Sequence, residues 1–446
     1  MRFSIDEIVS AVSGKLLFKK KDTDADGVFT DSREKKENAL FIPLAGENFD
    51  GHDYISAAVS NGAAGYLTQK ETDADADFAI LVKDTRLALG DLARYAMTKT
   101  KAKVIAVTGS VGKTTTRQFI ASLTAQLGKT LVTIKNFNND IGLPLTVLSM
   151  DGDEDYIVLE LGMSALGEIS YLSKIVKPDI GVITMIGTSH IEKLGTRENI
   201  LKAKLEILDG MSDDGILFIN GDDELLAPLH GKLKVKTELF GFNNGKYPLK
   251  IISCENGGEF IYDGDMYKIS TSGKHNIINA ACAISVAKCL GANRLQIQAG
   301  LDSFKNVGLR QELYHIGGKD IILDCYNASL DSFKASLAVL SGRNSRRKIA
   351  VLGGIGELGD YTEEILVKVG EEAYLNYTDL LIVCDENCEY IKNGAIKAGM
   401  KEKNILVYPK KEELIKDINS LLQDGDCVLI KASRKYKFED IFNAIK

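Results

Sequence analysis

The segment Thr108–Thr116, T-G-S-V-G-K-T-T-T, constrains the fold of this chain more than any other. It follows an apolar, β-branched run, V-I-A-V-T at 104–108, and precedes a stretch with helical spacing, R-Q-F-I-A-S-L-T-A-Q-L at 117–127. This order is typical of a phosphate-binding loop, because glycines let the backbone approach anionic oxygens and the helix dipole attracts them. Lys113 is expected to contact the β- and γ-phosphates of a nucleotide, and Thr114 to ligate Mg²⁺.

The loop is a shortened variant of the usual phosphate-binding motif. The full motif is G-x-x-x-x-G-K-[ST], but Val107 stands five residues before Gly112, so the spacing here is G-x-x-G-K-T-T. The preceding strand and following helix supply the context that a chance Gly-Lys-Thr turn lacks. Nucleotide binding is therefore the function that the residues alone support best.

Strands and helices alternate after this loop. Apolar runs at 156–161, 180–186 and 215–220 are separated by helical segments, which is typical of a parallel sheet covered on both faces. A polar, glycine-rich stretch at 241–274 predicts hairpins, and the apolar segment 276–290 predicts a buried helix.

A second alternation of strands and helices begins near residue 312. Its predicted strands are 321–326, 348–354, 379–384 and 427–431. Four such strands are enough for a small doubly wound unit. Before residue 100 the chain has short strands and turns, followed by a predicted helix at 85–101. Because 446 residues exceed the size at which single cores stop growing, we expect two or three domains.

Composition and charge exclude several classes of protein. The net charge of −7 argues against non-specific binding of nucleic acid. The seven cysteines are scattered without metal or disulfide spacing, which predicts reduced thiols. The N-terminus has no long apolar segment of a secretory signal, and no run approaches the ~18 apolar residues of a membrane span. We therefore expect a cytoplasmic protein without membrane insertion, and we take a monomer as the default.

Two further side chains follow strands that should end near the phosphate loop. Glu160 is a carboxylate inside an otherwise apolar strand, where an unpaired charge is costly, so Mg²⁺ is a natural partner. A surface acid at a strand end is the alternative. His190 lies just beyond the strand at 180–186, where open α/β sheets place their ligand sites, although a structural histidine is equally compatible.

At this point the chain resembles a known family, the Mur ligases of peptidoglycan synthesis, over essentially its whole length. The loop G-x-x-G-K-T-T, together with L-E-L-G at 159–162, H-I-E-K-L-G-T at 190–196 and H-N-I-I-N-A at 275–280, is similar to that family's motifs. Within the family it looks most like the members that add D-alanyl-D-alanine to UDP-N-acetylmuramoyl-tripeptide. The segments behind this choice are T-D-S-R at 30–33, the stretch 40–54, N-F-N-N-D-I-G-L-P at 136–144 and G-E-L-G-D-Y-T at 356–362.

The resemblance implies three α/β domains and a set of metal ligands. The domains would be a small UDP-sugar-binding domain at 1–100, a central P-loop ATPase domain with a parallel sheet at 101–309, and a Rossmann-like acceptor domain at 310–446. Two Mg²⁺ ions are implied, held by Thr114, Glu160, His190 and Lys204. Lys204 matches the family's carbamylated lysine, although Lys202 stands nearby, and as a carbamate it is anionic and can serve the metal site.

The same resemblance implies roles for other residues. Lys113, Glu160, His190 and Lys204 would be catalytic. The nucleotide would be bound by Thr108, Gly109, Ser110, Val111, Gly112, Lys113, Thr114, Thr115, Asn279, Arg310, Asp324 and Asn327. The UDP substrate would be bound by Ser32, Arg33, Asn48, Asp50, His52, Asn138 and Asn139, although Asn48, Asp50 and His52 are equally compatible with turn residues only. Lys431, Ser433 and Arg434 would lie on the acceptor side.

The C-terminal segments depart from the family pattern. Leu323, Ser329 and Leu330 stand where the family has Asp, Asn and Pro; Gly354 and Ile355 replace Asp and Met; and Ala432 replaces Gly. These segments belong to the domain that should receive the incoming amine, so a divergent paralogue with another acceptor stays open as an alternative.

The implied reaction is an ATP-dependent amide ligation. The γ-phosphate of ATP activates a carboxylate as an acyl phosphate, and an amine then attacks, releasing phosphate. Lys113, Arg310 and Mg²⁺ would stabilise the spread negative charge of the transition state. Because nucleotide residues fall on two domains, we expect an open apo form that closes on its substrates. The rivals are another Mur ligase or a folylpolyglutamate synthase relative, and, from another class, a P-loop regulatory or chaperone ATPase.

Overall fold

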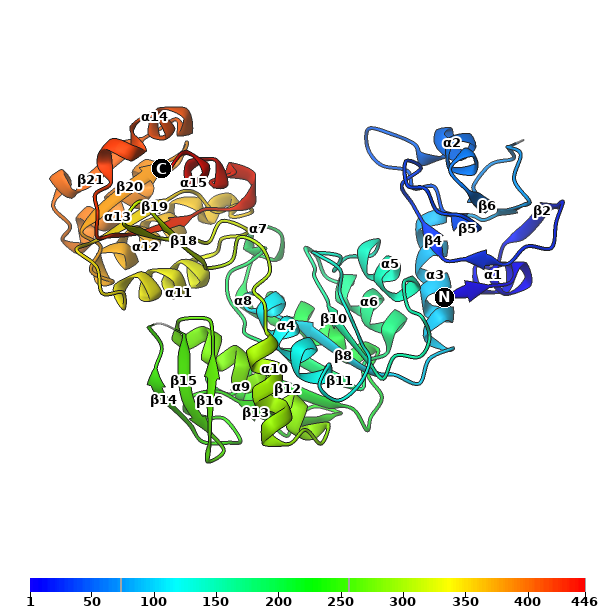
Figure 1. Ribbon diagram of the computed structural model, residues 1–446, viewed down its shortest axis with the longest axis horizontal. Helices are drawn as coiled ribbons and strands as arrows, with labels where there is room; N and C mark the ends of the chain where they lie inside the picture. Colours follow the sequence, from blue (N-terminus) through cyan, green and yellow to red (C-terminus); the bar gives the residue numbers. More distant parts are fainter. Residues whose placement is uncertain (73, 256, 446) are drawn as a thin grey trace.

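The computed structural model describes residues 1–72, 74–255 and 257–445, and its strands form five sheets (Figure 1). The N-terminal region (blue) and the C-terminal region (yellow to red) lie on either side of the central region (cyan to green) in Figure 1. This three-part α/β architecture confirms the predicted fold class. Among the described helices, none combines the length and the apolar character that a membrane crossing requires.

The N-terminal region is built on a mixed sheet. Its strands, in spatial order, are β2 (Lys15–Lys19), β7 (Phe78–Leu81), β6 (Ala63–Thr68), β5 (Ala39–Phe41) and β4 (Val28–Phe29). Only β2 runs antiparallel to its neighbour. The other elements are β1 (Arg2–Phe3), which pairs with β3 (Ala25–Asp26), and the helices α1 (Ile5–Ala11) and α2 (Ile55–Ser60).

Helix α3 (Thr85–Met97) joins this region to the centre. It contacts α1 on one side and α5 (Gly142–Leu148) and α6 (Glu168–Val176) on the other. The predicted extension to Lys101 is wrong. The amides of Thr98 and Lys99 bond to carbonyls three residues back, at 2.9 and 3.0 Å, and such tight turns end a helix.

The central region holds the predicted parallel sheet. Its strands, in spatial order, are β13 (Lys236–Phe240), β12 (Ile216–Asn220), β11 (Ile180–Ile183), β8 (Lys103–Thr108), β10 (Tyr156–Glu160) and β9 (Thr130–Val132). The four predicted strands are confirmed as β8, β10, β11 and β12, whereas β9 and β13 were not predicted. Because β8 lies between β10 and β11, the phosphate loop that follows it occupies the middle of the carboxyl edge.

Apolar helices cover one face of the central sheet. Helix α4 (Lys113–Thr124) packs on α9 (Lys274–Cys289) and on α10 (Arg294–Ser303). As predicted, α9 is buried along most of its length. The predicted hairpins before it are confirmed as an antiparallel sheet of β14 (Leu249–Ser253), β15 (Gly258–Tyr262) and β16 (Asp265–Ile269).

The C-terminal region is a doubly wound unit, as predicted. Its strands, in spatial order, are β17 (Glu312–Ile316), β18 (Lys319–Leu323), β22 (Asp426–Lys431), β19 (Arg347–Leu352), β20 (Leu380–Cys384) and β21 (Ile405–Tyr408). All pairs are parallel except β17 with β18. One face packs on α11 (Leu330–Ser341), α12 (Thr362–Leu375) and α13 (Cys388–Ala398), and the other on α14 (Lys411–Leu421) and α15 (Glu439–Ala444).

The remaining helical elements are short. They are α7 (Ile191–Leu194), α8 (Arg197–Leu205), and 3₁₀ turns at Gly51–Tyr54, Glu206–Asp209, Ala227–Leu229, Gly359–Tyr361, Glu402–Asn404 and Arg434–Tyr436. The seven cysteines are free thiols, and five of them are buried.

Candidate active site

The phosphate loop turns sharply from β8 into α4. Gly109 has φ +142°, and a Cβ there would lie 1.9 Å from Thr184 Oγ1 on the neighbouring strand end. Gly112 has φ +86° and is the N-cap of α4, so Lys113 begins the helix. Both positions need glycine, because an L side chain would be strained in this backbone and would collide with a neighbour.

Lys113 is folded along the loop it follows. Its Nζ donates to the carbonyl oxygens of Gly109, at 2.8 Å, and Ser110, at 3.2 Å. Desolvation lowers the pKa of Lys113, although the nearby Glu160 carboxylate opposes this effect. The ammonium group therefore lies at the anion-binding end of the helix, where a phosphate would stabilise its charge.

Glu160 ends β10 beside this loop and is only 3% exposed. Its carboxylate accepts hydrogen bonds from Thr114 Oγ1, at 2.8 Å, and Asn138 Nδ2, at 2.9 Å. The alternative, a surface acid at a strand end, does not fit a side chain that is this deeply buried. A buried carboxylate next to a threonine hydroxyl gives the oxygen donors that Mg²⁺ prefers, so these two residues fit the predicted ion.

Arg117 is a member of this cluster that the sequence reasoning missed. It is 2% exposed on α4, its Nη1 donates to the Thr133 carbonyl at 2.6 Å, and its Nε lies 3.8 Å from Glu160 Oε2. Burial lowers its pKa, and Glu160 counteracts that effect. An arginine beside the apolar F-I-A-S-L run of α4 was the available signal, because a charge on a packed helix face needs a partner.

His190 and Lys204 flank the same edge of the sheet. His190, with φ +64°, is the N-cap residue of α7, and its Nδ1 lies 2.5 Å from Glu357 Oε2 of the C-terminal region. Lys204, on α8, is 1% exposed, and burial lowers its pKa well below the usual range of lysine, with Lys113 adding to the effect. Lys202 is exposed, so Lys204 is the lysine of the pair that is enclosed.

A cleft of about 530 Å³ gathers residues from the central and C-terminal regions. From the predicted nucleotide and metal sets its lining includes Ser110, Val111, Gly112, Lys113, Thr114, Thr115, Glu160, His190, Asn279, Arg310, Asp324 and Asn327. Asn138, Asn139 and Lys431 also line it. Thr108, Gly109 and Lys204 are not among the lining residues.

The C-terminal wall of the cleft is held by charge interactions. Lys431 is buried and donates to Asp324 Oδ2 at 2.7 Å. The Arg310 guanidinium carbon lies 3.8 Å from the centre of the Tyr326 ring, a cation–π contact. The structure therefore puts Lys431, predicted on the acceptor side, beside the predicted nucleotide residue Asp324.

The predicted UDP-binding residues fall into two groups. Asn138 and Asn139 lie in the cleft, whereas Ser32, Arg33, Asn48, Asp50 and His52 lie in the N-terminal region and do not line it. His52 is buried, with Nδ1 2.6 Å from Asp50 Oδ1 and Nε2 accepting from the Gln69 amide at 3.2 Å. Arg33 is exposed and pairs with Asp31.

Two of the C-terminal departures from the family pattern, Gly354 and Ser329, have local structural reasons. A Cβ at Gly354 would lie 2.5 Å from the Tyr436 hydroxyl, so that ring fills the space a larger side chain would need. Ser329 caps α11 by accepting from the Ser332 amide, a role that serine and asparagine share. Ser433 accepts from the Gly356 amide, and Arg434 pairs with Glu439, both outside the cleft lining.

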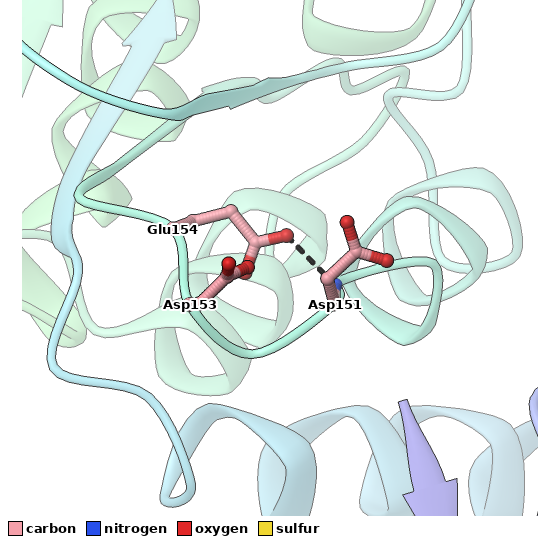
Figure 2. A group of neighbouring side chains, drawn as sticks. All are labelled: Asp151, Asp153 and Glu154. Carbon is pink, nitrogen blue, oxygen red and sulfur yellow. Dashed lines mark hydrogen bonds between the residues drawn. The ribbon is translucent and has the colours of Figure 1, made fainter.

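A separate acidic group consists of Asp151, Asp153 and Glu154 (Figure 2). None of these three residues lines the cleft. The Lys129 ammonium pairs with both aspartates. Glu154 accepts from the backbone amides of Asp151 and Gly152, at 2.7 and 2.9 Å, and thereby closes the turn. These contacts account for the group as a turn stabilised by Lys129 and by two backbone amides.

Three family models match the chain in succession. They are described as "Mur ligase family, catalytic domain" at residues 24–97, "Mur ligase middle domain" at 107–287, and "Mur ligase, glutamate ligase domain" at 309–434.

Curated relatives and solved structures agree with these models. UDP-N-acetylmuramoyl-tripeptide–D-alanyl-D-alanine ligase of Bacillus subtilis is 38% identical over 93% of this chain and 92% of its own. The enzyme of the same name from Escherichia coli is 31% identical over 99% and 98%. MurF from Acinetobacter baumannii superposes with a TM-score of 0.92, at 28% identity, over 99% and 98%. MurF ligase from Thermotoga maritima, solved in complex with ADP, gives 0.82 at 30% identity, over 94% and 96%.

Proposed function

Because this chain belongs to the Mur ligase family, we propose that it joins D-alanyl-D-alanine to UDP-N-acetylmuramoyl-tripeptide in an ATP-dependent amide ligation. The observation that carries the proposal is the cleft, in which the phosphate loop and Glu160 of the central region face Arg310 and Asp324 of the C-terminal region. Relatives that match more than nine-tenths of the chain carry that activity in their names.

The cleft residues have distinct tasks in this reaction. Lys113 and Arg310 bind the phosphates of ATP, and the amides of the phosphate loop orient them. Thr114 and Glu160 would hold Mg²⁺, which supplies positive charge against the phosphates. A substrate carboxylate oxygen attacks the γ-phosphorus and ADP leaves. The acceptor amine then attacks the acyl carbon, the bond from that carbon to the phosphate oxygen breaks, and the amide forms as the nitrogen loses a proton and phosphate leaves.

Lys204 is proposed to act as a carbamate. Its burial favours the neutral amine, which is the form that adds to carbon dioxide. The resulting anion would suit a second Mg²⁺ ion that His190 helps to hold. Activity should therefore rise with added bicarbonate after the protein has been depleted of carbon dioxide. A flat response would count against the carbamate.

The N-terminal region is proposed to bind the UDP end of the substrate. Ser32, Arg33 and Asn48 have the hydroxyl, guanidinium and amide groups that suit phosphate and uracil contacts. Asp50 and His52 already hold each other, so we assign them the support of the turn before α2. We further propose that the domains span 1–100, 101–309 and 310–446, and that the protein is a cytoplasmic monomer that binds no nucleic acid.

Phosphate release across a matrix of UDP-muramoyl peptides and candidate amines tests the function. We expect turnover only with ATP, the tripeptide precursor and D-alanyl-D-alanine together. Release with another amine instead would identify a divergent acceptor, in line with the changes at Leu323, Leu330 and Ala432. ATP hydrolysis without either co-substrate would point to a regulatory ATPase. No release with the tripeptide precursor and D-alanyl-D-alanine would refute the assignment.

A further inference from the structure

The loop 135–141 lies between β9 and α5, and at its inner side it touches the active-site carboxylate. Asn138 Nδ2 donates to Glu160 Oε1 at 2.9 Å, and the Asn138 carbonyl accepts from the Gly162 amide at 2.8 Å. A Cβ on Gly162 would lie 2.8 Å from the Asn138 side chain. The Asn138 amide is therefore closely packed against the strand end that carries Glu160.

The outer side of the same loop is tied to helix α3. Asp140 accepts two hydrogen bonds from one guanidinium, from Arg86 Nε at 2.5 Å and from Arg86 Nη2 at 2.9 Å. Arg86 itself is fixed in the first turn of α3, because the Asp84 carboxylate accepts from its amide at 2.8 Å. A bidentate pair defines the direction of both side chains, which a single contact does not.

The exposure of this pair argues against a role in overall stability. The side chains of Arg86 and Asp140 are 52% and 35% exposed. Exposed ion pairs contribute little to folding, because water screens them. Asp140 lies two residues after Asn138, which contacts Glu160. Because the Arg86–Asp140 pair adds little to folding, we explain it better as a contact that orients the loop.

We propose that the Arg86–Asp140 pair positions Asn138 against Glu160 and so couples α3 of the N-terminal region to the metal end of the cleft. Arg86 and Asp140 are positioning residues, since they act through Asn138. The inference rests on the proposed Mg²⁺ role of Glu160, but it does not depend on which amine is the acceptor. Loss of the pair should untie the outer side of the loop, so that the Asn138 amide is held less precisely against Glu160, and Glu160 should then hold Mg²⁺ less well.

The test compares Arg86→Met and Asp140→Asn with the matched control Arg94→Met. Arg94 lies on the same helix and pairs with Asp91 at 2.6 Å with similar exposure, 40% and 38%, but that pair contacts neither the loop nor the cleft. The readout is ADP binding by calorimetry with and without Mg²⁺, together with the thermal midpoint of the ligand-free proteins. No acceptor or turnover is needed.

We expect Arg86→Met and Asp140→Asn to weaken Mg²⁺-dependent ADP binding by about tenfold, the lower end of what residues behind metal ligands contribute. Metal-free ADP binding and the thermal midpoint should match those of Arg94→Met. Arg86→Lys should restore only part of the affinity, because an ammonium cannot make the bidentate contact.

Several results would overturn the proposal. Equal Mg²⁺–ADP affinity in Arg86→Met and Arg94→Met would show that the pair does not position the site. An equal loss of metal-free ADP binding, or a lowered thermal midpoint, would show general damage instead. Failure of the acceptor assay in the unsubstituted protein would leave this binding test intact, whereas absence of any Mg²⁺-dependent ADP binding would refute both proposals.

Discussion

At the scale of single residues, Glu160 is the buried carboxylate around which several cleft residues are arranged. It contacts Thr114 and Asn138 by hydrogen bonds and lies 3.8 Å from Arg117. Each contact offsets the cost of burying a carboxylate. The same contacts fix the rotamer of Glu160 from several sides, which suits the metal ligand proposed above.

Replacing Glu160 by Gln tests this role. The amide keeps the shape of the side chain but removes the charge, so we expect ATP-dependent turnover to fall by about 100-fold or more. ADP binding without Mg²⁺ should change little. The matched control is Glu259→Gln, on the exposed side of β15 and outside the cleft lining. Turnover within a factor of about two of the unsubstituted protein would contradict the assignment.

The buried carboxyl group of Asp385 should make the stability of the protein depend on pH. Desolvation raises the pKa of this buried carboxyl group to about 6, although the amides of Asn387 and Gly354 oppose the shift. The unfolded value is about 3.9, so the folded state binds the proton more tightly. Stability linked to Asp385 is therefore fully present below about pH 4 and is lost as pH rises through about pH 6, by at most about 3 kcal/mol.

The measurement compares urea unfolding of the protein and of Asp385→Asn across this range by circular dichroism. The variant has no carboxyl group to ionise, so the difference in unfolding free energy should shift in its favour as pH rises. Asp424→Asn, at an exposed position, is the control. A difference that stays constant with pH would show that Asp385 does not titrate in this way.

At the scale of elements, the turn from β8 into α4 shows how closely the backbone of the site is packed. Gly112, at φ +86°, is the N-cap of α4 and faces Asn279 of α9. Gly167 is the N-cap of α6 with almost the same backbone, φ +90°, but a Cβ there would have no neighbour within 4 Å. A substitution at Gly167 therefore introduces only backbone strain, whereas one at Gly112 introduces the same strain and a contact with the site.

We predict that Gly112→Ala and Gly167→Ala both lose about 1 kcal/mol of stability, because alanine is strained in the left-handed region. Only Gly112→Ala should also weaken ADP binding, by about tenfold or more, since its Cβ would lie 2.9 Å from Asn279 Oδ1. Calorimetric titration with ADP checks both variants. Equal ADP affinity in the two would mean that the loop accommodates the methyl group.

The elements that sequence patterns predicted are the long apolar ones. The strands β8, β10, β11 and β12 follow from β-branched runs, and the buried helix α9 from its apolar composition. The strands β9 and β13 were missed because T-L-V is short and K-T-E-L-F is largely polar, as suits strands at the edges of the sheet.

In the site, too, sequence patterns predicted the residues that stand in conspicuous local sequence and missed contacts between distant segments. The position of Glu160 could be inferred because a charge in an apolar strand is conspicuous, and Thr114 from the loop motif. The contacts of His190 with Glu357, 167 residues away, and of Arg86 with Asp140, 54 residues away, could not, because periodicity describes only local structure.

At the scale of the whole molecule, two kinds of contact connect the C-terminal region to the central region. The linker 306–311 has Leu309 and Gln311 in left-handed conformations, and Gln311 Oε1 accepts from Asn276 Nδ2 at 2.9 Å. The second kind of contact joins side chains of the C-terminal region to the segment 190–195. His190 Nδ1 contacts Glu357, and the Tyr361 hydroxyl donates to the Gly195 carbonyl at 2.9 Å. The contact with Glu357 uses only Nδ1 of His190, so Nε2 remains available to a metal while Glu357 orients the ring.

We predict that the C-terminal region moves when substrates bind. Small-angle scattering should show a smaller radius of gyration with a non-hydrolysable ATP analogue, Mg²⁺ and the UDP substrate together, because residues on both walls of the cleft then share one ligand. Lys113→Met, which removes the ammonium group proposed to bind the phosphates, is the control, and its radius of gyration should stay unchanged on adding the ligands. Identical scattering with and without ligands would rule out closure.

The strand order of the C-terminal sheet has a consequence for how the chain is made. Each of the three large sheets is assembled from one continuous stretch of sequence, so the N-terminal and central sheets can form while the ribosome is still adding residues. The C-terminal sheet is completed later than the order of its first strands would allow, because β22, its last strand, inserts between β18 and β19. The wall of the cleft that carries Asp324 therefore stays split until Lys431 has been synthesised, and a nascent chain stopped before that point would have the phosphate loop without its opposite wall.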